Sequence, residues 1–339
     1  MDMFQLTRAR DVADAVRAAA AARTAQQGAD IRYLAGGTTL VDLMKLNVER
    51  PRHVIDISRL PLDRVEATAD GGLRIGAMVR NADLAQDPRV KRDYQVLSQA
   101  LLAGASAQLR NMATTGGNLL QRTRCVYFRD TAQPCNKREP GTGCSAIGGF
   151  NRTQAILGTS EHCIASNPSD MNVALMALQA GITIQGSGGE RSVPIGDFYT
   201  LPGDTPQREH VLEPGDLITA VTLPAPAAGT RSVYLKLRDR ASYEFALASA
   251  AVVLGMRDGK VTHVCVALGG VGTRPWRSLE AEAVLRGNSP DDATLRRAGE
   301  AALADARPQP GNAFKVELSK RCLAQAVRLA VAADDAAAG

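Results

Sequence analysis

Several features that define common functional classes are missing from this sequence. No stretch of 18 consecutive apolar residues is present, so no membrane-spanning helix is expected. The N-terminus, which begins Met1-Asp2-Met3-Phe4, has no basic region followed by an apolar one, so no signal peptide is expected. The 40 Lys and Arg residues are scattered among 35 acidic residues and form no basic run with interleaved aromatics. Nucleic-acid binding is therefore not expected, although the net charge is +5.

Cysteine is sparse, and its spacing excludes the commonest cysteine architectures. Six cysteines in 339 residues are too few for a disulfide framework. The sequence also lacks the C-x₂₋₄-C pair of structural zinc sites and the compact cysteine run of ferredoxins. Cys265 lies in an apolar strand pattern and Cys322 in a helical pattern, so both are interpreted as buried core thiols.

The other four cysteines lie in one irregular stretch, rich in glycine and proline, between residues 119 and 165. They are Cys125, Cys135, Cys144 and Cys163, separated by nine, eight and eighteen residues. A loop of this length without regular structure needs a function or a clamp. Four thiolates on one iron–sulfur cluster would provide both, while two disulfides or a zinc ion are alternatives that the spacing leaves open.

Two short glycine turns are candidates for binding a phosphate-bearing cofactor. The first, Ala35-Gly36-Gly37-Thr38-Thr39-Leu40, lies between a predicted strand and a predicted helix. Glycine lets the backbone approach a pyrophosphate closely, and exposed N–H groups at a helix start favour an anion. The second, Thr114-Thr115-Gly116-Gly117-Asn118, has the same chemistry. Each turn alone is more often a plain turn, but two in one chain favour a nucleotide that contacts both.

Asp170 follows Ser166-Asn167-Pro168-Ser169 at the start of a predicted helix. The simplest interpretation is that Ser169 or Asp170 caps this helix. A carboxylate that accepts hydrogen bonds from ribose or flavin groups is the functional alternative.

The order of predicted elements indicates an α+β protein of two or three domains. Residues 1–58 alternate helices and strands and are predicted to form a small parallel α/β layer. A hairpin around Asp70-Gly71-Gly72 and further strands follow, up to residue 223. The segment Pro224–Gly229 is the predicted linker, and residues 230–339 are predicted to form a separate α+β domain.

The chain resembles the FAD-binding subunit of the molybdenum hydroxylases, the family of xanthine dehydrogenase and carbon monoxide dehydrogenase. The resemblance rests on both glycine turns, on Ser169-Asp170 and on two later segments, all in the expected order. Tyr234-Leu235-Lys236-Leu237-Arg238 resembles the family's Tyr/Lys/Arg strand, and the segment from Ala267 to Pro275 resembles its Gly-Gly-x-x-x-x-Pro turn. It covers nearly the whole chain.

This resemblance implies a fold and a cofactor. Residues 1–223 would form an FAD-binding domain of the vanillyl-alcohol-oxidase (PCMH) type with α/β subdomains at 1–58 and 59–223. Residues 230–339 would form an α+β domain of the CO dehydrogenase flavoprotein type. The first turn would hold the FAD pyrophosphate, the second would line the same cofactor, and Lys236 would lie near the isoalloxazine. The implied FAD-binding residues are Ala35, Gly36, Gly37, Thr38, Thr39, Leu40, Thr114, Thr115, Gly117, Asn118, Asp170 and Lys236.

The sequence departs from most of the family between Asn118 and Asp170, where a long insertion replaces a short connection. An insertion that carries a [4Fe–4S] cluster is a feature of two subgroups, the periplasmic aldehyde oxidoreductases and the 4-hydroxybenzoyl-CoA reductases. The segments Arg122–Asp130 and Pro134–Lys137 look closest to the aldehyde group. By resemblance, the cluster ligands are Cys125, Cys135, Cys144 and Cys163. Smaller departures are Thr114, where many members have serine, and Gly104, where some have an aromatic residue.

The function implied is an FAD- and [4Fe–4S]-carrying electron-transfer subunit of a heterotrimeric molybdenum aldehyde oxidoreductase. The molybdenum cofactor would lie on a large subunit and [2Fe–2S] clusters on a small one, with FAD passing electrons to an external acceptor. No residue of this chain would be catalytic. Export to the periplasm as a folded complex on a partner's signal is expected, with the cytoplasm as the alternative.

Three other functions are weighed against this one. The first is the flavin subunit of a 4-hydroxybenzoyl-CoA reductase. The second is a zinc- or disulfide-stapled binding module without catalysis. The third is a self-contained flavin oxidase, which would need its own acid–base pair, and the four histidines suggest none.

Overall fold

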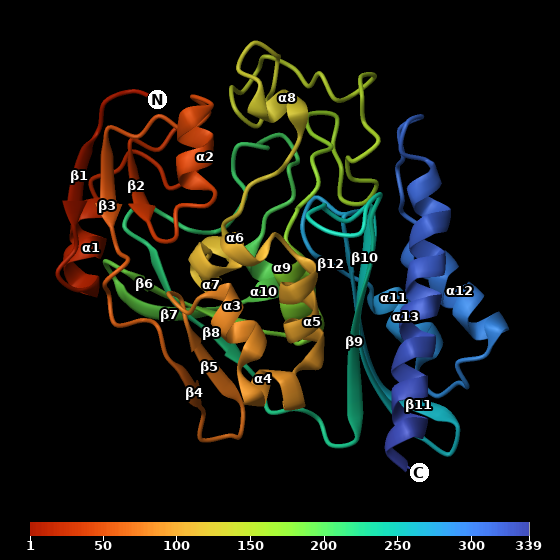
Figure 1. The fold of residues 1–339 in the computed structure, drawn as a ribbon. Coiled ribbons are helices and arrows are strands. Elements are labelled where there is room, and N and C mark those ends of the chain that lie inside the picture. Colours follow the sequence, from red (N-terminus) through yellow and green to blue (C-terminus); the bar gives the residue numbers. More distant parts are fainter. Residues whose placement is uncertain (339) are drawn as a thin grey trace.

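The computed structural model describes residues 1–338, with side chains described to residue 332, and it contains three β-sheets (Figure 1). The first sheet is parallel, with strand order β1-β3-β2, and α1 and α2 connect its strands. Its elements are β1 (Gln5–Arg8), α1 (Val12–Ala19), β2 (Ile31–Leu34), α2 (Leu40–Lys45) and β3 (His53–Asp56). The predicted parallel layer is therefore present, and β1 adds an edge strand that the sequence pattern did not indicate.

The second sheet is antiparallel, with order β4-β5-β8-β6-β7. Its strands are β4 (Val65–Ala67), β5 (Leu73–Gly76), β6 (Gly181–Gly186), β7 (Gly189–Pro194) and β8 (Leu217–Leu223). The predicted β4–β5 hairpin is confirmed, since Gly71 adopts φ +84° and Thr68 N–H bonds the carbonyl of Gly72. Segments more than a hundred residues apart thus meet in one sheet.

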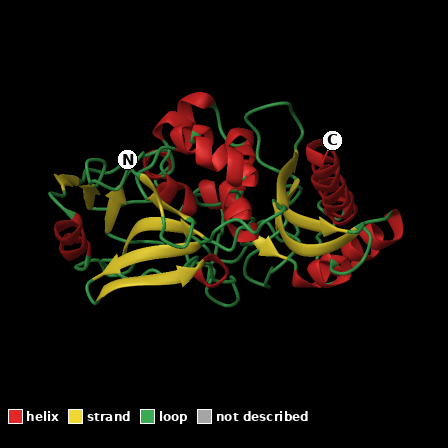
Figure 2. Cartoon of the chain, turned by 90° about the horizontal axis from the view of Figure 1, so that it is seen from below, coloured by secondary structure: helices red, strands yellow, loops and turns green. Residues whose placement is uncertain are grey.

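A group of helices lies between the second sheet and the third (Figure 2). Ser106 caps α6 and Ser169 caps α9, each accepting a backbone N–H three residues on. The helices α6 and α7 fall where the sequence pattern indicated irregular chain. The group and the short helices near it are α3 (Asn81–Gln86), α4 (Pro88–Asp93), α5 (Gln95–Ala103), α6 (Ala107–Met112), α7 (Thr115–Leu119), α8 (Val126–Arg129), α9 (Asp170–Ala177) and α10 (Ile195–Phe198).

The third sheet, in the C-terminal part of the chain, is antiparallel with order β12-β11-β10-β9. The turn Asp258-Gly259 has positive φ at both residues, which matches the right-handed twist of the hairpin. This part comprises β9 (Thr230–Leu237), β10 (Ala248–Arg257), β11 (Lys260–Gly269), β12 (Trp276–Arg277), α11 (Leu279–Leu285), α12 (Asp292–Ala302) and α13 (Phe314–Ala338).

Both faces of this third sheet are buried. Along β10, Ala251 and Val253 belong to the core shared with α5 and α9, while Val252 and Leu254 belong to the core beneath α11–α13. Because side chains alternate along a strand, a strand buried on both faces is a continuous apolar run. Such a run lacks the alternation of a half-buried strand, so its sequence alone does not distinguish a strand from a buried helix.

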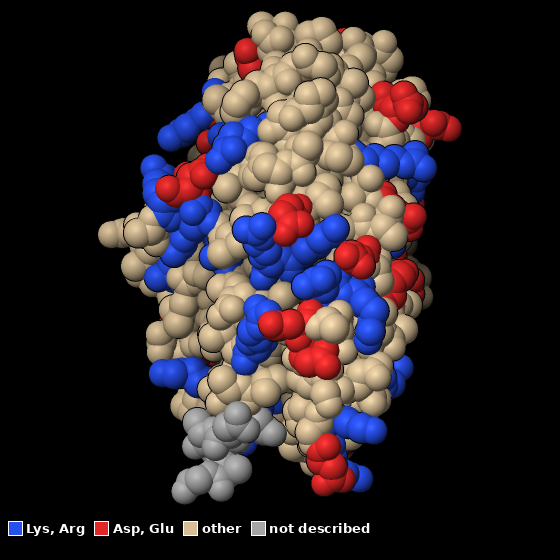
Figure 3. Space-filling model, turned by 90° about the vertical axis from the view of Figure 1, so that its right-hand side faces the viewer, with Lys and Arg blue, Asp and Glu red and all other residues tan. Residues whose placement is uncertain are grey.

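The outer face of the C-terminal part carries charges of both signs (Figure 3). Arg328 pairs with Asp292 at 2.8 Å and Arg321 with Glu317 at 2.8 Å. The mixture leaves no broad field of one sign on this face. Among the helices of residues 1–338, none combines the length and the apolar character that crossing a bilayer requires.

The cysteine insertion, which contains α8, lies at the top of Figure 1 beside α2, and it is anchored to the C-terminal part. The backbone N–H groups of Ile156 and Leu157 both donate to the carbonyl of Val271. Lys315, which is fully buried, donates from Nζ to the carbonyls of Gln154 and Gly270 at 2.9 and 2.8 Å. The insertion is therefore a packed element that connects the two domains.

Candidate functional site

A long cleft lies between the first sheet, the second sheet and the start of the cysteine insertion. It contains about 1820 Å³ of atom-free space, including its solvent-filled mouth. Several residues predicted to bind a cofactor line it together. They are Ala35, Gly36, Gly37, Thr38, Thr39, Leu40, Thr114 and Gly117.

The turn after β2 presents backbone donors to this cleft. Within residues 1–338, the N–H groups of Gly36, Gly37, Thr38 and Thr39 have no protein acceptor. Gly37 has φ +74°, and a Cβ on Gly36 would lie 1.9 Å from the backbone oxygen of Met112. The turn therefore needs glycine twice, and its free N–H groups form an anion-binding concavity.

The second predicted turn is the first turn of α7. Thr114 Oγ1 caps the helix by accepting the N–H of Gly117 at 3.2 Å. Thr115 is buried with its hydroxyl on the carbonyl of Val79, and Asn118 Oδ1 accepts from Ser169 Oγ at 2.7 Å. Thr115 and Asn118 thus support the cleft wall from behind, whereas Thr114 and Gly117 face the cleft.

Asp170 and Lys236 meet at the junction of the two domains, outside the cleft lining. Asp170, at the first position of α9, accepts from Lys236 Nζ at 2.8 Å and from Tyr234 Oη at 2.5 Å. The side chains of Lys236 and Asp170 are only 3% and 8% exposed. Burial raises the pKa of Tyr234 well above its ordinary value, and the Asp170 carboxylate raises it further. Their predicted contacts with FAD stay predictions.

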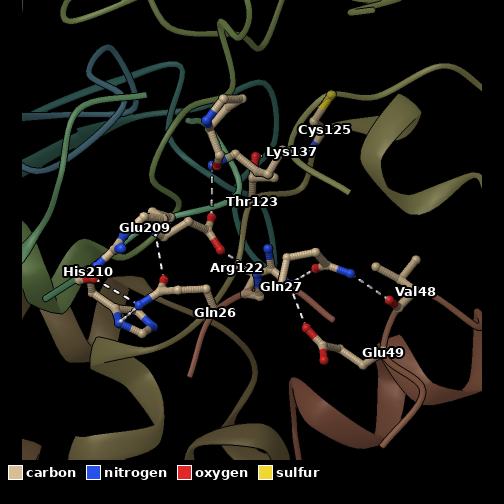
Figure 4. Close-up of polar contacts among 12 residues, drawn as sticks. Gln26, Gln27, Val48, Glu49, Arg122, Thr123, Cys125, Lys137, Glu209 and His210 are labelled. Carbon is tan, nitrogen blue, oxygen red and sulfur yellow. Dashed lines mark hydrogen bonds and ion pairs between the residues drawn. The ribbon is translucent and has the colours of Figure 1, made fainter. Parts of the chain in front are cut away.

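Sequence reasoning missed the charged wall at the far side of the cleft (Figure 4). Arg122 pairs with Glu49 and Glu209, Glu49 also pairs with Arg32 at 3.0 Å, and Glu209 with Lys137 at 3.0 Å. Burial raises the pKa of the Glu209 carboxyl, but Arg122 and then Lys137 outweigh it and hold the pKa at about 2. Charged residues far apart in sequence carry no local pattern that would have revealed this network.

His210 lies at the end of this wall and is held neutral. The side-chain amide of Gln26 is oriented by its Oε1, which accepts the backbone N–H of Glu209. The Nε2 group of Gln26 therefore points toward His210 Nδ1, at 3.2 Å, and donates to the carbonyls of His210 and Leu212. A ring nitrogen that accepts a hydrogen bond is unprotonated. Burial lowers the pKa of His210 to about 4, although Glu209 opposes that shift.

Acidification between pH 6.5 and pH 4 is expected to destabilise the fold through His210. In this window the unfolded chain binds a proton at the imidazole that the folded chain excludes, so stability falls as pH falls. The contribution is about 3 kcal/mol at most. Unfolding midpoints measured across this window should depend less on pH in His210→Gln. The half-exposed His162 supplies the control variant His162→Gln, and equal pH dependence in all three proteins would contradict the assignment.

The four cysteines of the insertion line one cavity, which contains about 280 Å³ of atom-free space including its opening to solvent. All are free thiols, and the backbone N–H of Ala165 approaches Cys163 Sγ at 3.5 Å. Among the side chains that the structure describes, no three of His, Cys, Asp or Glu converge closely enough to hold a single metal ion. No disulfide joins these four thiols.

The cysteine cavity and the cleft have a common wall. Lys137, Cys163 and Ala165 line both. Burial raises the pKa of the Cys163 thiol to about 11, and the Lys137 ammonium opposes that rise. Burial lowers the pKa of Lys137, but Glu209 and Cys163 together outweigh burial, so the pKa of Lys137 is raised overall.

Comparison with known families decides what kind of cleft this is. Residues 2–226 match the model of the FAD binding domain in molybdopterin dehydrogenase, and residues 233–330 match the CO dehydrogenase flavoprotein C-terminal domain. The chain belongs to the FAD-binding subunits of the molybdenum hydroxylases. This membership confirms the predicted fold class and rejects the non-catalytic binding module.

Relatives and solved structures in this family resemble the chain over most of its length. The aldehyde oxidoreductase FAD-binding subunit PaoB of Escherichia coli is 54% identical over 90% of this chain and 93% of its own. The glyceraldehyde dehydrogenase medium chain of Sulfolobus acidocaldarius is 29% identical over 77% of this chain and 75% of its own length. The reconstituted CO dehydrogenase from Oligotropha carboxidovorans gives a TM-score of 0.76 at 25% identity, over 98% of both chains.

The cleft of this FAD-binding subunit fits its cofactor. The unpaired N–H groups of Gly36 to Thr39 suit the two negative charges of a pyrophosphate. The missing side chain at Gly36 lets the turn pack directly on the α6–α7 connection, so both predicted turns border one cleft. The residues that would hold FAD therefore come from the turn after β2 of the first sheet and from the start of α7.

Proposed function

We propose that this chain is the FAD- and [4Fe–4S]-carrying electron-transfer subunit of a heterotrimeric molybdenum aldehyde oxidoreductase. The observation that carries the proposal is the wall common to the FAD cleft and the four-cysteine cavity. The names of the E. coli and Sulfolobus relatives, an aldehyde oxidoreductase subunit and a glyceraldehyde dehydrogenase chain, support an aldehyde as the substrate class.

The cysteine cavity supports a [4Fe–4S] cluster by its donor set. Thiolate sulfurs are the ligands that such clusters use, four to a cluster. Cys125, Cys135 and Cys163 are buried, and Cys144 is partly so, beside the buried ring of Phe128. Burial limits the access of water to three of the four thiols, and solvent access is one of the factors that set the potential of a cluster.

In this proposal FAD supplies two-electron chemistry and the cluster one-electron chemistry, and the protein supplies position and electrostatics. The residues from Gly36 to Thr39 bind the pyrophosphate, and the residues of the charged wall fix the cleft's shape. Aldehyde oxidation takes place at the molybdenum cofactor of a large partner subunit. A small [2Fe–2S] subunit delivers electrons to this chain, and an external acceptor removes them.

We also propose that the complex is exported folded to the periplasm on a partner's signal. The support is the likeness of the segment Arg122–Asp130 to the periplasmic aldehyde group. Cell fractionation with an antibody to this chain tests it. Recovery in the periplasmic fraction is expected, and recovery in the cytoplasmic fraction alone would overturn the export.

The proposed cofactors are tested by an anaerobic visible spectrum with iron and acid-labile sulfide assays on the purified complex. Relative to wild type, Cys135→Ser is expected to keep the flavin bands but lose about four irons per complex. Cys322→Ser, which changes a buried thiol outside the cavity, serves as the control and should keep its iron. Equal iron in wild type and Cys135→Ser would reject the cluster, and a colourless wild-type chain would reject the whole proposal.

A further inference from the structure

Lys137 occupies the common wall and faces the cysteine cavity as well as the cleft. Its side chain is only 10% exposed. Among the described residues that line the cysteine cavity, it is the only Lys, Arg, Asp or Glu. A fixed charge is therefore built into the boundary between the two proposed cofactor sites.

The position of this charge is fixed by two buried contacts. Lys137 Nζ donates to the carbonyl of Pro206 at 2.9 Å and to Glu209 Oε1 at 3.0 Å. Glu209 is held in turn by Arg122, whose guanidinium also lies over the ring of Phe128 at 4.6 Å. Phe128 lines the cysteine cavity, so the network braces that cavity from the cleft side.

The charges of this network do not cancel. Its cations are Arg32, Arg122 and Lys137, and its anions are Glu49 and Glu209. One positive charge is left over, and the neutral His210 beside it adds none. Charges inside a protein interact far more strongly than charges in water. The excess charge therefore favours added negative charge at the thiolate site beside Lys137.

We propose that Lys137 sets the reduction potential of the metal cluster held by the four cysteines, acting through its charge and not by ligation. The inference rests on the proposed function, because it requires the cluster. The step concerned is uptake of one electron by the cluster from a one-electron donor, with no bond formed or broken. Since reduction makes the cluster more negative, the Lys137 ammonium stabilises the reduced state and raises the potential.

The opposite charges of Lys137 and Glu209 allow a test by sign. Lys137→Met removes a positive charge and should lower the cluster potential. Glu209→Gln removes a negative charge from the same network and should raise it. Lys137→Arg keeps the charge and should leave the potential near the wild-type value. A purely structural role for the network predicts no such ordering, because both Lys137→Met and Glu209→Gln break the same ion pair.

The measurement is an anaerobic redox titration of the purified complex, followed by electron paramagnetic resonance, after iron and sulfide have been assayed in each variant. Lys137→Met is expected to lower the equilibrium constant for reduction of the cluster about tenfold, which lowers its reduction potential by about 59 mV for a one-electron couple. An unchanged potential in Lys137→Met with full iron, or shifts of the same sign in Lys137→Met and Glu209→Gln, would overturn the inference. If Lys137→Met fails to assemble, the sign of the Glu209→Gln shift decides alone. Absence of the extra iron from the wild-type complex would instead reject the proposed function.

Discussion

Replacing Gly36 by alanine is expected to reduce bound FAD about tenfold or more, and to lower the unfolding midpoint. The new Cβ would lie 1.9 Å from the carbonyl oxygen of Met112 and 3.2 Å from Cα of Ala113. Both are backbone atoms, so no side-chain rotation relieves the clash. The turn and the α6–α7 connection must separate, and both segments border the cleft.

Flavin content is measured from the absorbance of the purified complex and from FAD released on denaturation. Gly188→Ala is the matched control, because a Cβ at Gly188, in the β6–β7 turn, would meet nothing within 4 Å. It should retain FAD and stability. Full flavin content in Gly36→Ala would show that the two segments can move apart without loss of the site.

Replacing Asp170 by asparagine is expected to destabilise the chain by about 3–5 kcal/mol. The substitution leaves the Lys236 ammonium buried without a negatively charged partner, and its remaining contact with the carbonyl of Ala103, at 3.1 Å, is to a neutral group. Asp170 belongs to the FAD-binding domain and Lys236 to the C-terminal domain. Loss of this ion pair therefore weakens the contact between the two domains, and its effect is not confined to one helix or strand.

A double variant separates this buried charge from other effects. Adding Lys236→Met to Asp170→Asn removes the unpaired ammonium and should restore most of the stability. Asp292→Asn is the control, because Asp292 pairs with Arg328 at the surface and is 85% exposed, so its loss should cost less than about 1 kcal/mol. Unfolding midpoints of the three variants are compared. Equal midpoints for Asp170→Asn and Asp292→Asn would contradict the prediction, and loss of FAD at unchanged stability would indicate direct contact with the flavin.

Local elements could be predicted where a single residue type strongly favours one backbone conformation. The Asp70-Gly71-Gly72 and Asp258-Gly259 turns and the helix cap at Ser169 follow from conformations that these residue types favour. β1 was missed because its four residues at the edge of a sheet show no alternation that distinguishes them from loop. The α7 turn was missed as a helix because its two glycines disfavour one, and contacts with Val79 and Ala77 override that preference.

The candidate site likewise contains residues that the sequence revealed and residues that it did not. The glycine turns and the four cysteines were recognisable because backbone approach to an anion and thiolate ligation each require particular residue types. The wall of Arg122, Glu209 and their partners was not recognisable, since any exposed charge has the same sequence signature as a buried one. Only the tertiary structure brings residues 26, 49, 122, 137 and 209 together.

The sequence by itself determined the family, the order of the domains and the identity of the groups that are proposed to bind the pyrophosphate and the cluster. These depend on covalent chemistry and short-range conformation, which a few neighbouring residues specify. Only the tertiary structure decided that the cleft and the cysteine cavity adjoin, that Lys137 lies in the wall between them, and that Asp170 pairs with Lys236. Those relations arise from packing between distant segments, and the burial of each charge is a property of everything that surrounds it.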